Sequence, residues 1–350
     1  ISMSADVQGI FVSQKISKIR WLPEDYVESK CFITGSWDDD NNSIKVWSSF
    51  GDQRQESTEQ PRVLSQFAVN GDVTEIKFTD NNRIAASVSS GDIHLLEISN
   101  YDKTTPPRVI YSWDKLHNHG SKPCSCSSMD TLDGDIVTGG EDGVINMLNC
   151  RQGSIGATIK DSDGCTFNSI CFLRYREIIT GDIRGHMKTW DLRASTEEPT
   201  SSFLLSEEEL AATCINNHPT QPYIVLVGSE SGSLTVWDLR TKSYPASSLK
   251  GHKASLTEMQ FHPENPQKLF TSSASGEIWS WDMDIINRST KLPEAQAVMA
   301  WTPLEDKMNK IVNNLIPPIH QSVNTLHCDK DKIIAGADNE AVYLLSKVQY

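Results

Sequence analysis

A large apolar residue returns seven times along the chain, each time five residues after a position typical of a tight turn. The turn positions are mostly glycine, which adopts positive φ at low steric cost, as a tight hairpin between two strands requires. Successive apolar positions lie 42 to 64 residues apart, which brackets the length of a four-stranded propeller blade. The pattern therefore predicts an array of seven similar units. These apolar positions, called the blade markers below, are Trp47, Leu96, Leu148, Trp190, Trp237, Trp281 and Leu345.

Hydrophobic and polar residues alternate between turn and marker, as in residues 185–190 and 232–237. Alternate side chains of such a segment fall on opposite faces of a strand. A second strand ending in small residues precedes each turn, for example residues 136–140 and 224–229, and further strands such as residues 73–78 lie upstream. Small residues let neighbouring sheets approach, while the markers fill the space between them. We therefore predict an all-β fold, a seven-bladed β-propeller.

The two ends of the chain indicate how the ring closes. The last block, residues 323–345, has three strand-like runs and too little chain after them for a fourth. The N-terminal segment contains a spare strand at about residues 10–15, before the first strand of the first full blade at residues 16–21. We expect this spare strand to complete the C-terminal blade, which would remove an exposed sheet edge. Residues 1–350 then form a single domain, with an inserted loop region at about residues 285–321.

Three blades end in Trp-Asp pairs, at Trp190-Asp191, Trp237-Asp238 and Trp281-Asp282, and these pairs resemble the WD40 family. Gly251-His252, about thirty residues before Trp281, is similar to the Gly-His opening of a WD40 repeat. The family's hydrogen-bonded set of His, Asp, Ser/Thr and Trp is complete in no block of the sequence. The resemblance implies a WD40-type propeller built from degenerate repeats.

The formal net charge of −14 and a pI near 5.1 argue against a nucleic-acid surface, which needs a basic field to collect phosphates. No apolar run approaches the length of a membrane span, so we expect no membrane insertion. The eight cysteines lie mostly within or beside apolar strands, where reduced thiols behave as small hydrophobes, and we expect an intracellular protein without disulfides.

Two candidate metal features have simpler interpretations. His117, His119, Cys124 and Cys126 offer four zinc donors, but their spacing matches no common zinc module, and a polar connecting loop explains them. The acidic run Asp38–Asp40 is explained by a solvated turn. We expect no metal and no cofactor.

No catalytic pattern is found in the sequence: there is no nucleophile elbow, no phosphate-binding Gly-rich loop with Lys, no zinc-protease helix and no kinase motif set. We therefore expect no enzyme activity, and a rigid disc that binds partners through its loops. The inserted region at 285–321 is apolar for a solvent loop, and it either packs on its own propeller or docks another chain. Its candidate contact residues are Trp301, Ile316 and Ile319.

Residues 11–18, 32–38, 261–266 and 322–326 resemble the family of forty-three-kilodalton WD-repeat nucleoporins. This resemblance implies a non-catalytic scaffold subunit of the Y-shaped complex in the outer rings of the nuclear pore, held on the short arm by an α-helical nucleoporin. It also implies roles in pore assembly and in protein and mRNA transport between nucleus and cytoplasm, and kinetochore association in mitosis. We expect the isolated chain to be a monomer.

An alternative function rests on Trp190-Asp-Leu-Arg193 and Trp237-Asp-Leu-Arg240. These segments resemble the Trp-Asp-x-Arg box of propellers that serve as substrate receptors for cullin-RING ubiquitin ligases. The same letters also arise wherever a strand ends and a basic residue caps the turn.

Overall fold

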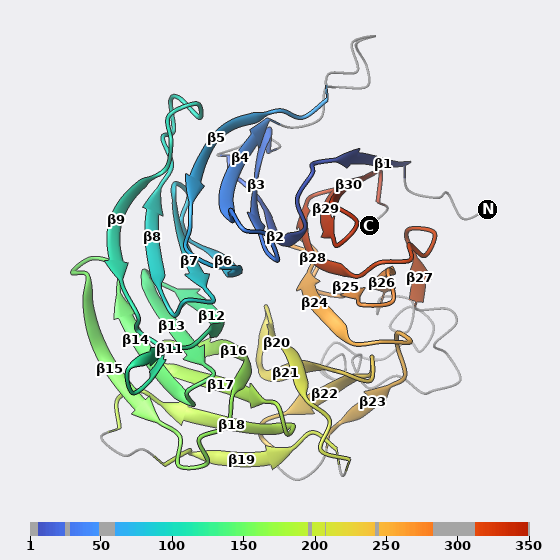
Figure 1. The fold of residues 1–350 in the computed structure, drawn as a ribbon. Coiled ribbons are helices and arrows are strands. Elements are labelled where there is room, and N and C mark those ends of the chain that lie inside the picture. Colours follow the sequence, from blue (N-terminus) through green and yellow to red (C-terminus); the bar gives the residue numbers. More distant parts are fainter. Residues whose placement is uncertain are drawn as a thin grey trace.

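A computed structural model describes residues 6–24, 29–48, 60–194, 198–206, 208–241, 245–282 and 312–348. Within these ranges every regular element is a β-strand, so no helix there is long and apolar enough to cross a membrane. Seven four-stranded antiparallel sheets, the blades, are arranged around one axis (Figure 1). The predicted seven-bladed propeller of the WD40 type is confirmed.

In each blade the first strand lies at the axis and the last at the rim, so the chain runs outward through the blade and then crosses to the next inner strand (Figure 1). Blades 1, 2 and 3 contain β2 (Ile16–Trp21), β3 (Cys31–Ser36), β4 (Ser43–Ser48) and β5 (Val63–Ala68); β6 (Val73–Asp80), β7 (Arg83–Val88), β8 (Ile93–Glu97) and β9 (Arg108–Trp113); and β12 (Cys126–Leu132), β13 (Asp135–Gly140), β14 (Val144–Asn149) and β15 (Ser154–Lys160).

A small separate hairpin lies between blades 2 and 3, and the remaining blades repeat the same order. The hairpin pairs β10 (Asn118–His119) with β11 (Lys122–Pro123). Blades 4 to 7 contain β16 (Phe167–Arg174), β17 (Glu177–Asp182), β18 (His186–Asp191) and β19 (Ser201–Leu204); β20 (Ala212–His218), β21 (Gln221–Ser229), β22 (Leu234–Asp238) and β23 (Ser247–Leu249); β24 (Leu256–Phe261), β25 (Lys268–Ser273), β26 (Ile278–Asp282) and β27 (Val312–Asn314); and β28 (Val323–Asp329), β29 (Lys332–Ala337), β30 (Ala341–Ser346) and β1 (Asp6–Phe11).

The N-terminal strand closes the ring. β1 pairs antiparallel with β30, from Asp6 opposite Ser346 to Phe11 opposite Ala341, and forms the outer strand of blade 7. The expected strand exchange is therefore present, but the strand runs over residues 6–11 rather than about 10–15. After β1, Val12 is buried, with 8 % of its surface exposed, and Ser13 adopts a φ of +58°. These two residues form the turn that connects β1 to β2.

Seven buried clusters fill the seven seams between blades. Each contains one blade marker together with apolar residues of the preceding blade; Trp237, for example, packs with Ile179 and Met187 of blade 4. The markers are between 0 % and 6 % exposed. Because every seam holds a bulky side chain, the apolar material of the chain is spread around the ring rather than gathered in one core.

The tight turns between second and third strands need glycine because another backbone segment presses on them. A Cβ at Gly276 would lie 1.8 Å from the carbonyl oxygen of Ile319, and Gly276 has φ of +82°. Gly232 similarly meets the carbonyl of His252 at 2.3 Å. In each case the contact comes from the connection that leads to the next blade, so turns and blade-to-blade connections lie on the same face of the disc. This face is called the upper face below, and the opposite face the lower face.

Side chains on the inner strands also tie successive blades together. Thr74 of blade 2 donates to the carbonyl of Cys126 in blade 3 at 2.6 Å, and Ser169 of blade 4 donates to Ala212 of blade 5 at 3.1 Å. Equivalent bonds run from Ser127 to Phe167, from Thr257 to Val323 and from Asn324 to Ile16. Because these bonds join the beginnings of neighbouring inner strands, the inner strands all run in the same direction.

Candidate interaction surfaces

The central channel is crossed by a network of charges around Arg20, which is 4 % exposed. Arg20 Nη2 donates to Glu75 Oε1 and to Glu258 Oε1, both at 2.6 Å. Its Nε donates to the carbonyl of Ile76 at 3.0 Å, and Nη1 lies 3.1 Å from Thr325 Oγ1. One side chain of blade 1 thus holds the inner strands of blades 2, 6 and 7, across the seam where the ring closes.

This network shifts the titration of its members. Burial alone would raise the pKa of Glu258, but Arg20 and Lys18 outweigh burial and hold that pKa well below its usual value. Burial, reinforced by Arg20, lowers the pKa of His327 to about 3. The neutral His327 ring accepts a hydrogen bond at Nδ1 from the backbone N–H of Trp21, 3.1 Å away. Glu258 therefore stays ionised and His327 neutral around neutral pH.

The channel encloses a cavity of about 300 Å³ lined by inner strands. Several of its charged and amide groups have partners within the protein: Lys77 Nζ lies 3.6 Å from Asp130, and Asp130 accepts the backbone N–H of Phe172 at 2.8 Å, whereas the buried hydroxyl of Ser128 has no hydrogen-bond partner in the described part of the chain. Asn217 lines the same cavity and donates toward the carbonyl of Leu173 at 3.5 Å. These contacts join neighbouring blades, so the channel side chains serve the cohesion of the ring.

The histidine of the suspected zinc motif is a structural residue of blade 3. His117 is fully buried, its Nδ1 lies 2.9 Å from Asp142, and its Nε2 lies 2.9 Å from Thr138 Oγ1. His119 is exposed on β10, whereas Cys124 and Cys126 are buried. Within the described residues, no group of three or more His, Cys, Asp or Glu side chains is arranged to hold a metal ion.

A second histidine of the same kind lies in blade 6. His252 Nε2 is 2.8 Å from Thr271 Oγ1, which also accepts the indole N–H of Trp281 at 2.9 Å, and His252 Nδ1 faces Glu277 at 3.4 Å. The hydrogen-bonded WD40 set, complete in no block by sequence, is thus complete in blade 6 with Glu277 in the place of Asp. The sequence pointed to His252 through its Gly-His pair but not to the structural role of His117, although in each blade the carboxylate follows the histidine by 25 residues.

In each Trp-Asp-Leu-Arg box, the arginine pairs with the aspartate of the same box. Arg193 contacts both carboxylate oxygens of Asp191, at 2.8 and 2.7 Å, and Arg240 contacts those of Asp238 at 2.9 and 2.5 Å. The guanidinium of Arg240 also stacks on Tyr223, 3.7 Å from the ring centre. The basic residue of each box therefore caps the turn at the end of its own strand.

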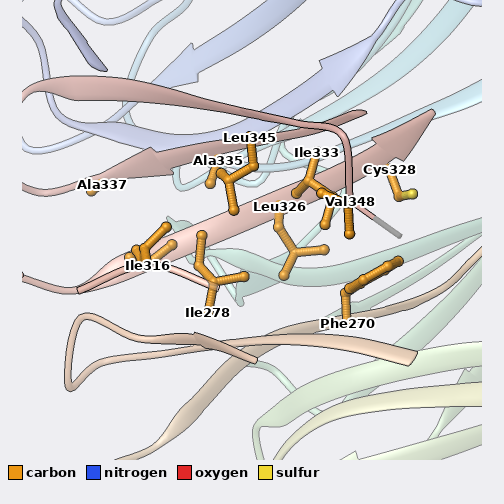
Figure 2. Packing of buried hydrophobic residues seen from close by; sticks show 11 residues of the cluster. Phe270, Ile278, Ile316, Leu326, Cys328, Ile333, Ala335, Ala337, Leu345 and Val348 are labelled. Atoms are coloured by element: carbon orange, nitrogen blue, oxygen red, sulfur yellow. The ribbon is translucent and has the colours of Figure 1, made fainter. Parts of the chain in front are cut away.

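The candidate residues of the inserted region divide into two groups. Ile316 is 4 % exposed and packs with Phe270, Ile278 and other residues in the seam between blades 6 and 7 (Figure 2). Ile319 packs against the same cluster, and its backbone N–H donates to the carbonyl of Gly276 at 3.0 Å. Placing these two residues on a partner surface was wrong, because they pack on their own propeller. Trp301 lies outside the described residues.

The inserted region is also shorter than expected. Residues 312–314 form β27, the outer strand of blade 6, and residues 315–321 connect it to blade 7. The final ten residues of the segment expected as an insertion, 285–321, are therefore part of the regular blade pattern.

Among the described residues, exposed charge is distributed unequally between the two faces of the disc. Exposed acidic residues outnumber exposed basic residues in the described upper-face turns and connections, whereas exposed basic residues outnumber acidic ones in the described lower-face turns. The exposed upper-face acids are Asp38, Asp39, Asp40, Asp114, Glu141, Asp163, Glu208, Glu209 and Glu230, against Lys115, Lys122, Lys160, Arg184, Lys250 and Lys253. The exposed lower-face bases are Lys30, Arg62, Arg108, Arg151, Arg174, Arg193, Arg240 and Lys347, against Asp80, Asp102, Asp133, Glu198 and Glu264.

Comparisons with known proteins agree with the fold and extend it. The family model described as "WD domain, G-beta repeat" matches residues 200–238 and 243–282. The chain is 32 % identical to "Nucleoporin Nup43" of Homo sapiens, over 97 % of this chain and 98 % of that protein, and 31 % identical to the Mus musculus protein of the same name over the same shares. It is 24 % identical to "Nuclear pore complex protein NUP43" of Arabidopsis thaliana, over 69 % of this chain and 71 % of the plant protein.

Proposed function

Because the chain belongs to the Nup43 family of nucleoporins, we propose that it is a non-catalytic scaffold subunit of the nuclear pore complex. We propose that it belongs to the Y-shaped subcomplex of the outer ring, where α-helical scaffold nucleoporins bind it. The observation that carries the proposal is the extent of the similarity, which spans nearly the whole of both chains and not only the repeats that all WD40 proteins share.

The closed ring supports a scaffold that binds through its surface. β1 occupies the edge of β30, so blade 7 is complete without a strand from another protein. A partner therefore binds to preformed loops and faces and does not need to supply a missing strand. Trp301 stays a candidate contact residue of this surface.

The pairing of the channel side chains supports a non-catalytic role. The buried acids and bases at the axis contact each other and neighbouring backbone groups, and the arginines of the two Trp-Asp-Leu-Arg boxes are bound to their own aspartates. Neither arrangement favours an enzyme or a ligase receptor over a scaffold. We further propose that the protein supports pore assembly and transport at the nuclear envelope, and that it associates with kinetochores in mitosis.

Affinity purification from cells of the source organism tests this proposal. A tagged chain is expected to recover the α-helical subunits of the Y-shaped complex and to form a rim around the nucleus in interphase. In mitotic cells the same tag is expected at kinetochores. Recovery of a ligase adaptor without nucleoporins would contradict the proposal, and a rim signal without a kinetochore signal would contradict the mitotic part alone.

A further inference from the structure

The lower face of blades 3 and 4 concentrates guanidinium groups around an exposed aromatic ring. Tyr175 is 53 % exposed at the turn between β16 and β17. The arginine patch, as it is called below, consists of Tyr175 together with Arg151, Arg174, Arg176 and Arg193. Arginine and tyrosine are enriched at the centres of protein interfaces because both give large contact areas with directed hydrogen bonds.

Two arginines of the patch come from turns of different blades and act electrostatically on the same carboxylate, that of Asp135. Arg151 lies in the turn between β14 and β15, and Arg176 lies in the turn between β16 and β17. Both act electrostatically on Asp135, which is 5 % exposed and accepts the amide of Asn149 at 3.0 Å. Burial raises the pKa of Asp135, and the two guanidiniums oppose that rise. The patch therefore spans the lower end of the seam between the two blades.

The arginines differ in how far their donors are used within the chain. Arg174 Nε lies 2.6 Å from Glu177, and Arg193 is held by Asp191. By contrast, Arg151 and Arg176 form no ion pair with any carboxylate in the described ranges, and the guanidinium of Arg176 lies 5.3 Å from the ring centre of Tyr175. A guanidinium presents five N–H donors in a planar fork that matches a carboxylate. Apart from the interaction of Arg176 with Tyr175, the guanidinium donors of Arg151 and Arg176 are thus available to bind carboxylates of another molecule.

We propose that the arginine patch is the docking surface for the α-helical scaffold partner and that it receives a carboxylate-rich segment of that partner. This inference rests on the proposed function and adds to it which face of the disc is occupied. The upper face, with its excess of exposed acids, repels such a segment, whereas the patch offers bidentate pairing and an aromatic anchor. The stacked pair Tyr223 and Arg240, at the lower end of blade 5, extends the surface.

Charge reversal on one face, matched by charge reversal on the other, tests the proposal. The double variant Arg151→Glu with Arg176→Glu alters the patch, and Arg184→Glu with Lys253→Glu makes the same change in net charge on the upper face, where both residues are exposed. The probe is the purified α-helical nucleoporin of the short arm, and its affinity for each full-length variant is measured by titration at two salt concentrations. Melting temperatures establish that both variants are folded.

The patch variant is expected to bind at least about ten-fold more weakly, with a smaller dependence on salt, while the upper-face variant stays within about two-fold of the unaltered chain. Tyr175→Ala is expected to weaken binding about ten-fold without changing the salt dependence. Equal affinities of patch variant and unaltered chain, or a loss confined to the upper-face variant, would overturn the assignment of the face. Failure of the unaltered chain to bind the probe would instead overturn the proposed function.

Discussion

Removing Arg20 is expected to destabilise the ring more than removing any exposed arginine. Arg20 is 4 % exposed and lies between Glu75 and Glu258, each 2.6 Å from its Nη2. In the variant Arg20→Met, two nearly buried carboxylates lose their closest cation and keep only Lys18, which lies 3.1 Å from Glu75 and 4.0 Å from Glu258. Truncating one partner of a buried ion pair costs about 3–5 kcal/mol, because the remaining charge stays buried. The free energy of unfolding at pH 7 should fall by about that amount.

The loss of stability in Arg20→Met should also depend on pH, and the direction of this dependence can be predicted. In the unaltered chain the pKa of Glu258 lies below its unfolded value of about 4.3, so this contribution is fully present above that pH and is lost as the pH falls further. Without Arg20, Lys18 is the remaining cation that opposes burial, so the pKa of Glu258 rises well above its value in the unaltered chain. Acid then protonates the folded variant first, so the stability difference between the two proteins should shrink between pH 7 and pH 4.

Urea or thermal unfolding at several pH values measures both effects. Arg240→Met is the matched control, because its pair with Asp238 is 55 % exposed on the arginine side and should be worth less than about 1 kcal/mol. Adding Lys18→Met, Glu75→Gln and Glu258→Gln to Arg20→Met should recover part of the loss, since all four charges of the network are then removed together. A loss below about 1 kcal/mol for Arg20→Met, or a difference that stays constant with pH, would refute the reasoning.

Other predictions follow from the seams, the closing strand and the buried histidines. Trp237→Ala should lower the free energy of unfolding by about 3–5 kcal/mol because it empties the seam between blades 4 and 5, whereas Tyr101→Ala, at a fully exposed residue, should change it by less than about 0.5 kcal/mol in the same urea titration. Deleting residues 1–11 should lower the melting temperature sharply, because it exposes the edge of β30. The control is deletion of residues 1–5, which leaves β1 whole. An unchanged melting curve for the longer deletion would contradict closure of the ring by β1. His327→Gln should flatten the loss of stability between pH 6.5 and pH 5.5, since the depressed pKa of about 3 means that only the unfolded chain gains a proton there. For an unfolded pKa of about 6.5 this loss amounts to about 1 kcal/mol, and an unaltered slope would argue against a neutral His327.

The sequence was sufficient for the features that repeat and insufficient for those that depend on ring closure. The spacing of the markers and the turn glycines predicted the number of blades, because each blade solves the same local packing problem. The Arg20 network could not be predicted, since Glu75 and Glu258 lie far from Arg20 along the chain and meet it only when blades 1, 2 and 6 surround one axis.

Three details of the structure were not predicted, each for an identifiable physical reason. For Ile316 and Ile319, the sequence left open whether they contact a partner or pack on the propeller, because the short strand β27 carries no pattern of its own; in the structure both residues pack in the seam between blades 6 and 7. The closing strand began earlier than expected because Val7 and Phe11 are exposed at the rim, 41 % and 70 %, so the alternation does not mark the strand as a buried one. His117 was assigned to a polar connecting loop, because its partner Asp142 follows 25 residues later and reaches it only through the fold of the blade.

The pairing of β1 with β30 also constrains the order of events during synthesis. β1 is translated before all strands of blades 1 to 6, whereas its partner β30 is translated after them, so these blades can assemble before β1 has a partner. At about 5–20 residues per second, that interval lasts tens of seconds. In a nascent or prematurely terminated chain that lacks β30, β1 is therefore unpaired. Chaperones and proteases can use this unpaired strand to distinguish unfinished rings from finished ones.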